Sequence, residues 1–149
     1  MKINDGPTFE LLFKHARNEC TKEFLTTGVL VARIWGIFEN EINTMDVGKI
    51  LYDNKDAFAG VLWKMREVKM PYVFVTQSRI LFGKKQVKEA LEKGNPGIKE
   101  HQDSKPCLIM NTFDSENTNL HYNLIKQNVY LTSWMSFEGQ TIGGRFGNE

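Results

Sequence analysis

Residues 60–79 read GVLWKMREVKMPYVFVTQSR, and two different residue patterns meet there at Pro71. Before the proline, apolar residues recur at spacings of three and four, as they do on one face of a helix. We expect this helix to end at Met70, because the residue before a proline disfavours helical geometry. After the proline, YVFVTQSRILF at 72–82 is rich in β-branched and aromatic residues and predicts a strand.

The same stretch holds Glu67 and Lys69, which with Asp56 have the spacing of a Mg-dependent nuclease site of the form D-x10-E-x-K. Such a site needs a strand, on which residues two apart share a face. On a helix of 3.6 residues per turn, the same two side chains separate by roughly 200°. The helical spacing runs from Phe58 to Val68, so we expect both charges to be solvated, and the nuclease remains an alternative.

Elsewhere along the chain, helical patterns alternate with extended ones. The helices are expected at 8–25, 46–53, 56–69 and 84–94, with Thr8 as the first N-cap and Gly28 after the first C-terminus. The strands are expected at 28–38, 72–82, 106–113 and 129–137. Alternation of this kind predicts an α/β class, with a mixed sheet of about four strands packed against helices.

Two further features concern the end of the chain. Residues 115–128 fit either a helix or a strand; as a strand they would form a C-terminal hairpin, and the class would then be α+β. The stretch 139–149 is rich in glycine. We therefore expect a single globular domain over 1–138 and a flexible tail over 139–149.

Composition excludes several classes of protein. The formal net charge of +1 does not support nucleic-acid binding. No apolar run approaches the roughly 20 residues of a membrane span, and the start of the sequence lacks the apolar region of a secretory signal. Cys20 and Cys107 have no metal-ligand spacing, so we expect reduced thiols, no metal, no cofactor and a cytoplasmic protein.

Cys107 and His121 are a candidate pair of nucleophile and base. If 106–113 and 119–126 form a hairpin, the two residues lie about five strand positions, or roughly 15 Å, apart. We therefore expect Cys107 to act as a small core residue.

Arg33 and Arg79 each lie within a predicted strand. A charge in such a position needs a partner or a ligand, and two guanidinium groups on neighbouring strands could bind a phosphorylated small molecule. The alternative is that each arginine pairs with an acidic residue such as Glu39 or Asp114.

Phosphate-binding loops and the familiar hydrolase and kinase signatures are absent from the sequence. The leading hypothesis is therefore a small interaction or regulatory protein without catalytic activity, of the style of a viral or mobile-element accessory protein. It would bind a protein partner or form a homo-oligomer. The predicted contact residues are of types enriched in binding hot spots: Trp35, Trp63, Trp134 and Phe146.

Overall fold

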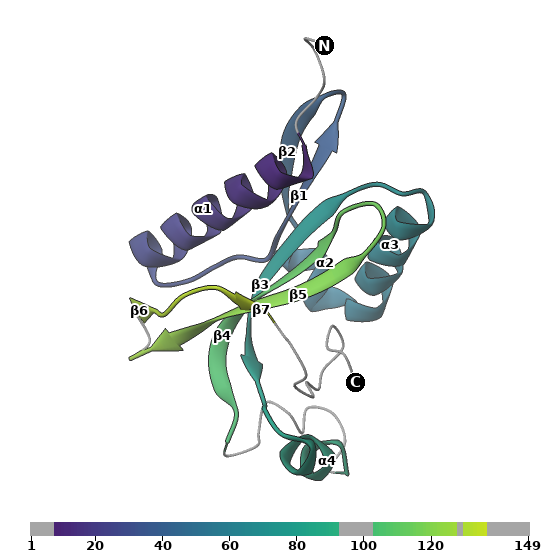
Figure 1. Cartoon of the computed structure of the whole chain (residues 1–149). Coiled ribbons are helices and arrows are strands. Elements are labelled where there is room, and N and C mark those ends of the chain that lie inside the picture. Colours follow the sequence, from purple (N-terminus) through teal and green to yellow (C-terminus); the bar gives the residue numbers. More distant parts are fainter. Residues whose placement is uncertain (1–7, 93–102, 128–129, 137–149) are drawn as a thin grey trace.

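The computed structural model describes residues 8–92, 103–127 and 130–136, which form an antiparallel sheet flanked by helices (Figure 1). The helices are α1 (Phe9–Thr27), α2 (Gly48–Asp53), α3 (Lys55–Glu67) and α4 (Lys84–Glu92). The strands are β1 (Arg33–Phe38), β2 (Glu41–Asp46), β3 (Tyr72–Ile80), β4 (Lys105–Phe113), β5 (Thr118–Lys126), β6 (Tyr130–Leu131) and β7 (Met135–Ser136).

The described strands pair in the order β2-β1-β3-β4-β5-β6, and β7 pairs with β5. Every pair is antiparallel, so the fold is α+β, and the predicted mixed sheet of about four strands is corrected to an antiparallel sheet of seven. The predicted tail at 139–149 lies outside the described residues.

Helix α1 begins and ends where its sequence predicts. The Thr8 hydroxyl accepts a hydrogen bond from the Leu11 amide, and Gly28 adopts the left-handed conformation, with its amide donating to the Phe24 carbonyl. A glycine serves this C-terminal position because it adopts positive φ without a steric penalty. None of the helices in the described ranges combines the length and apolar character that crossing a membrane requires.

Strand β2 is not among the strands that the sequence predicts. Glu39 and Asn40 both have positive φ, 50° and 63°, which is the signature of a two-residue type I′ hairpin turn. The turn folds the chain back, so that β2 pairs with β1 from Phe38↔Glu41 to Arg33↔Asp46. The predicted strand at 28–38 is correspondingly shorter, since β1 begins at Arg33.

Within the ambiguous segment 115–128, strand β5 (Thr118–Lys126) pairs antiparallel with β4, which confirms the hairpin alternative. Asp114 shapes the turn between β4 and β5, because its Oδ1 accepts hydrogen bonds from the amides of Glu116 and Asn117 at 2.9 and 2.7 Å. The strand predicted at 129–137 is divided into the two short strands β6 and β7.

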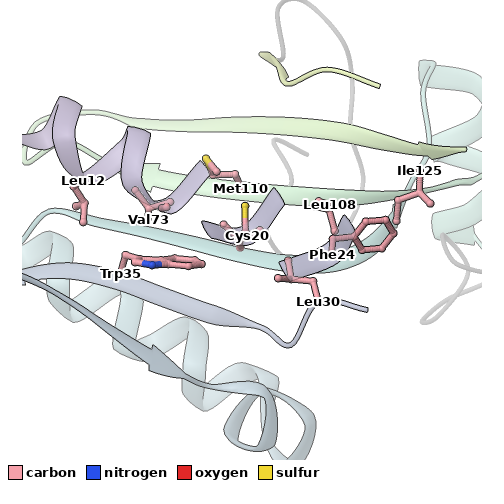
Figure 2. Close-up of a cluster of buried hydrophobic side chains, with 11 residues drawn as sticks. Leu12, Cys20, Phe24, Leu30, Trp35, Val73, Leu108, Met110 and Ile125 are labelled. Carbon is pink, nitrogen blue, oxygen red and sulfur yellow. The ribbon is translucent and has the colours of Figure 1, made fainter. Parts of the chain in front are cut away.

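Helix α1 covers one face of the sheet. Its inward residues Leu12, Ala16, Cys20 and Phe24 recur every fourth position and are fully or almost fully buried. They pack on a row of sheet residues that share this face (Figure 2): Trp35, Val73, Val75, Leu108, Met110 and Ile125.

Helices α2 and α3 cover part of the opposite face. Phe58 and Leu62 of α3 pack with Tyr72, Phe74 and Phe113 of the sheet, and the Phe58 and Phe74 ring centroids are 4.8 Å apart. Helix α4 lies beyond the end of β3, away from the other three helices, and packs on Leu81 (Figure 1). The α1 face is therefore separated from the α2–α3 face by a single layer of strands.

Candidate functional site

The two arginines predicted to bind a ligand lie on the α1 face of the sheet but apart from each other. Arg33 stands opposite Val75 in the β1–β3 register, and Arg79 is four residues further along β3. Four residues along a strand correspond to a distance of about 13 Å. The Arg79 guanidinium is bound by Ser104. Its Nε donates a hydrogen bond to the Ser104 hydroxyl and its Nη2 donates one to the Ser104 carbonyl, each at 2.8 Å. The structure thus does not bring the two guanidinium groups together around one anion.

Arg33 pairs with an acidic residue, although not with the ones expected. Its Nε lies 3.2 Å from Oε1 of Glu23 on α1. The other oxygen of Glu23 accepts a hydrogen bond from the Val31 amide at 3.1 Å. Glu23 therefore fixes the chain that enters β1 and positions the Arg33 side chain at the same time.

The three tryptophans occupy different environments. Trp35 is 1% exposed and belongs to the core under α1, so its placement does not support the predicted role in partner binding. Trp134 is half-buried, packs on the same core and donates a hydrogen bond to the Thr21 hydroxyl at 3.3 Å. Trp63 on α3 is 63% exposed. Phe146 lies outside the described residues.

A groove of about 520 Å³ runs between α1 and the β1–β2 hairpin. Its volume lies within the range of small-molecule pockets, about 300–1,000 Å³. Helix α1 contributes Glu19, Lys22, Glu23, Thr26 and Thr27, and the hairpin contributes Arg33, Trp35 and Thr44.

Glu19 lies at the centre of a short hydrogen-bond chain in this groove. Its Oε1 accepts from the Trp35 indole Nε1 at 3.0 Å and lies 2.8 Å from His15 Nε2, one helical turn earlier. The Glu19 side chain is nevertheless 49% exposed. Glu19 thus anchors a core tryptophan while keeping part of its carboxylate available in the groove.

The β2 strand forms one edge of the described sheet and borders the groove. In a two-residue hairpin the residues that flank the turn exchange hydrogen bonds, and bonded pairs then alternate along the strands. The hydrogen bond from the Val47 amide to the Ala32 carbonyl, 2.9 Å, continues this alternation beyond Asp46. The main-chain groups of Ile42, Thr44 and Asp46 therefore point away from β1, toward the open side of the edge.

The side chains of those same three residues lie on the groove side of the sheet. Thr44 stands opposite Trp35, and Asp46 stands opposite Arg33, so each pair shares the α1 face. The intervening residues Asn43 and Met45 point to the other face. The other edge of β2 pairs with no strand among the described residues, and any strand that paired with this free edge would place alternate side chains toward the groove.

The residues of the nuclease alternative occupy a helix and the turn after it. Glu67 is the last residue of α3, and its Oε2 lies 3.5 Å from the Nζ of Lys64, one turn earlier. Lys69 follows the helix and has a positive φ of 61°. Asp56 is in the first turn of α3, at the opposite end from Glu67. The helical backbone predicted for this stretch is confirmed, and no group of three or more metal-ligating side chains occurs among the described residues.

Cys107 and His121 lie on opposite faces of the sheet. Cys107 pairs with Leu124, and His121 pairs with Met110, three positions further along β4. Cys107 is fully buried, and burial raises the pKa of its thiol to about 12. The Nδ1 of His121 instead lies 3.1 Å from the Ser136 hydroxyl oxygen, and the two residues stand opposite each other in the β5–β7 pair.

Sequence reasoning missed the groove, because the strands that it predicts do not include β2, which forms the hairpin with β1. The available signal was the Glu39-Asn40 pair itself, since asparagine tolerates the positive φ of a type I′ turn.

Comparisons with known proteins assign no family to this chain. No protein-family model, no curated protein and no solved structure matches it. The candidate site is accordingly defined by its own geometry: the groove between α1 and β1, and the free edge of β2 beside it.

Proposed function

We propose that this chain is an interaction protein without catalytic activity that binds an extended segment of a protein partner along the free edge of β2. The observation that carries the proposal is the position of that edge, whose outward main-chain groups lie directly beside the groove. Strand addition of this kind takes its affinity from main-chain hydrogen bonds and its specificity from pockets for alternate side chains.

Several features of β2 favour pairing with another strand. It has six residues, contains no proline and no lysine, and five of its residues are exposed. Proteins commonly protect free edges with short strands, prolines or inward-pointing lysines, because such an edge pairs readily with other chains. The β2 edge contains no proline and no lysine, its two charged residues Glu41 and Asp46 stand at its ends, and it lies next to a groove that can receive side chains.

The proposal places the protein in the cytoplasm. Cys20 and Cys107 are both free and buried, on opposite sides of β4. Free thiols of this kind are typical of a reducing compartment.

The test compares two substitutions at one position. Thr44→Pro removes the outward N–H of the edge without removing a β1–β2 hydrogen bond, and Thr44→Val keeps that N–H. A displayed library of random octapeptides is selected against the full chain, and the selected peptides are measured against both variants. We expect selected peptides to bind the wild type and Thr44→Val, and to bind Thr44→Pro at least about tenfold more weakly.

Peptide chemistry gives a second measurement if Thr44→Pro does not fold. N-methylation of alternate peptide amides, in both possible registers, removes the donors that would face β2. One of the two methylated forms is expected to lose binding and the other to retain it. Failure to select any peptide, or equal binding of Thr44→Pro, would refute strand addition.

A second candidate surface on α3 is supported by a separate observation. Trp63 is exposed, and the Arg66 guanidinium carbon lies 5.2 Å from its ring centroid. Tryptophan and arginine are among the residue types enriched in binding hot spots, and the cation–π contact orders both side chains before binding. We retain Trp63 as a contact for a protein partner or for a second copy of the chain; loss of self-association or partner binding on Trp63→Ala is the corresponding test.

A further inference from the structure

We propose that His121 is an acid-sensitive latch, whose neutral ring holds β7 against β5 and whose protonation opens β7. The inference concerns the side of the described sheet that is remote from β2, and it does not rest on the proposed function. It follows from the contacts of the His121 ring, from the charge that faces the ring and from the small number of pairs that hold β7.

The His121 ring lies where β5, β7 and α1 meet. In β5 it stands opposite Met110 of β4 on one side and opposite Ser136 of β7 on the other. Its Nδ1 is 3.1 Å from the Ser136 hydroxyl oxygen, and its centroid is 5.1 Å from that of the Phe13 ring on α1. With its proton on Nε2, the neutral ring accepts a hydrogen bond from the Ser136 hydroxyl. The ring therefore joins β7 and α1 to β5.

A proton on this ring would create a cation that has no counter-charge beside it. The neighbours on β4 and β7, Met110 and Ser136, carry no charge, and within the described ranges no carboxylate forms an ion pair with His121. The charged group that acts on the ring from α1 is the Arg17 guanidinium, which also lies 5.4 Å from the Phe13 centroid. Burial and, to a smaller extent, repulsion from Arg17 both lower the pKa of His121.

Strand β7 is the neighbour of the ring that opens most readily. It pairs with β5 at two positions, His121↔Ser136 and Tyr122↔Met135, and both of its residues are exposed. Segments with few buried apolar contacts open at the lowest cost in free energy. Helix α1 is instead held by four buried residues: Leu12, Ala16, Cys20 and Phe24. Opening β7 would return the protonated ring to water and leave α1 on the core.

The segment between β6 and β7 has anchors that acid does not affect. The Thr132 amide donates to the Leu124 carbonyl at 3.1 Å, and the Thr132 hydroxyl donates to Asn123 Oδ1 at 3.2 Å. The Trp134 indole donates to the Thr21 hydroxyl of α1 at 3.3 Å. None of these groups titrates near neutral pH. Acid is therefore expected to open β7 alone and to free the main-chain groups of β5 that pair with it.

The latch fixes how the opening equilibrium depends on pH. With β7 open, the His121 ring is in water and titrates near its ordinary value of about 6.5. With β7 closed, it titrates at the lower value that burial and Arg17 impose. Between these two values, the ratio of open to closed molecules rises about tenfold for each unit by which the pH falls. Above about pH 6.5 the ratio is constant.

Amide hydrogen exchange, followed by NMR on the full chain, tests the latch. The protection factor of the β7 amide that bonds to β5 is measured from about pH 7.5 to about pH 4.5, together with the ring-proton shift of His121. We expect this protection factor to fall about tenfold per pH unit below about pH 6.5 and to level off once the ring is protonated. The amides of β4 are expected to keep their protection.

His121→Asn provides the residue-level test. The asparagine side chain keeps an acceptor near the position of Nδ1 and takes up no proton in this range, so β7 is expected to stay closed throughout. His15→Gln is the matched control, because it removes the histidine of α1 that lies 2.8 Å from Glu19 and leaves the His121 contacts in place. It is expected to open β7 with the same pH dependence as the wild type.

Several outcomes would overturn the latch. Protection of β7 that survives protonation of the His121 ring refutes it, as does a ring that stays neutral over the whole pH range. A β7 amide without protection at neutral pH would mean that the neutral ring holds nothing. Equal loss of protection in the wild type and in His121→Asn would assign the opening to another group. If His121→Asn does not fold, the wild type decides, because ring titration and β7 opening must follow the same linkage.

Discussion

The indole of Trp35 donates a hydrogen bond to the Glu19 carboxylate across the boundary between the core and the groove, with Nε1 and Oε1 3.0 Å apart. Trp35 is 1% exposed, whereas the Glu19 side chain is 49% exposed. The same carboxylate therefore satisfies a buried donor of the core and faces the proposed partner. Substitutions at Glu19 must be chosen so that stability and binding can be separated.

Glu19→Leu is expected to destabilise the protein more than Glu19→Gln. Leucine leaves the Trp35 N–H buried without an acceptor, which typically costs about 1–3 kcal/mol. Glutamine keeps an amide oxygen at the same distance from the backbone. Urea unfolding of the two variants gives the difference, and equal midpoints with unchanged slopes would show that the Trp35 hydrogen bond contributes nothing.

The elements with strong local signals were predictable from the sequence. Helix α1 has an apolar residue at every fourth position and capping residues at both ends, and these features coincide in the structure with Thr8 and Gly28. The break at Pro71 likewise separated α3 from β3. Local propensity and capping chemistry are sufficient where several signals agree along one short stretch.

The candidate site depended on pairings that sequence periodicity does not encode. β2 is polar and largely exposed, so its alternation carries no burial signal. Arg33 was recognised as a charge that needs a partner, but the choice of Glu23 follows from how α1 crosses the sheet. The separation of Arg33 from Arg79 likewise depends on the β1–β3 register, which a single sequence does not determine.

His121 is expected to resist protonation in the folded protein. Burial is the larger cause that lowers its pKa, and repulsion from Arg17 on α1 is the smaller one. The Phe13 ring and the Ser136 hydroxyl also face it. Because the unfolded state then binds the proton more readily, the stability due to a neutral His121 is present above about pH 6.5 and is lost as the pH falls through the lower folded value.

Arg17→Gln tests the charge contribution to this shift. Removing the guanidinium is expected to raise the pKa of His121, as followed by the ring-proton chemical shift in an NMR titration. Arg33→Gln, in β1 and paired with Glu23 rather than facing His121, serves as the control and is expected to leave that titration unchanged. An identical titration curve in Arg17→Gln would leave burial as the whole cause.

Trp63 is expected to dominate the solvent-accessible fluorescence. It is the exposed member of a set in which Trp35 is buried and Trp134 half-buried, so acrylamide should quench it most efficiently. Trp63→Phe is expected to remove most of the quenchable emission and to change the free energy of unfolding by less than about 1 kcal/mol, the scale of an exposed cation–π contact. Trp35→Phe is the contrasting variant, because it removes a buried hydrogen bond; quenching that survives in Trp63→Phe would contradict the exposure assigned to α3.

The two cysteines are expected to make the protein less stable in alkali. Burial raises the pKa of both thiols from about 9 to about 12. Between these values the unfolded chain loses thiol protons that the folded chain keeps, so the stability is fully present below about pH 9 and falls as the pH rises toward 12. Each thiol contributes a loss of about 1.4 kcal/mol per pH unit within that window.

Urea unfolding at pH 8 and pH 10.5 measures the total loss of stability. The double variant Cys20→Ala, Cys107→Ala retains every other titrating group, including Tyr72, whose pKa burial also raises. Its stability should fall less steeply with pH than that of the wild type, and equal slopes would mean that the thiols are not buried from water as the structure places them.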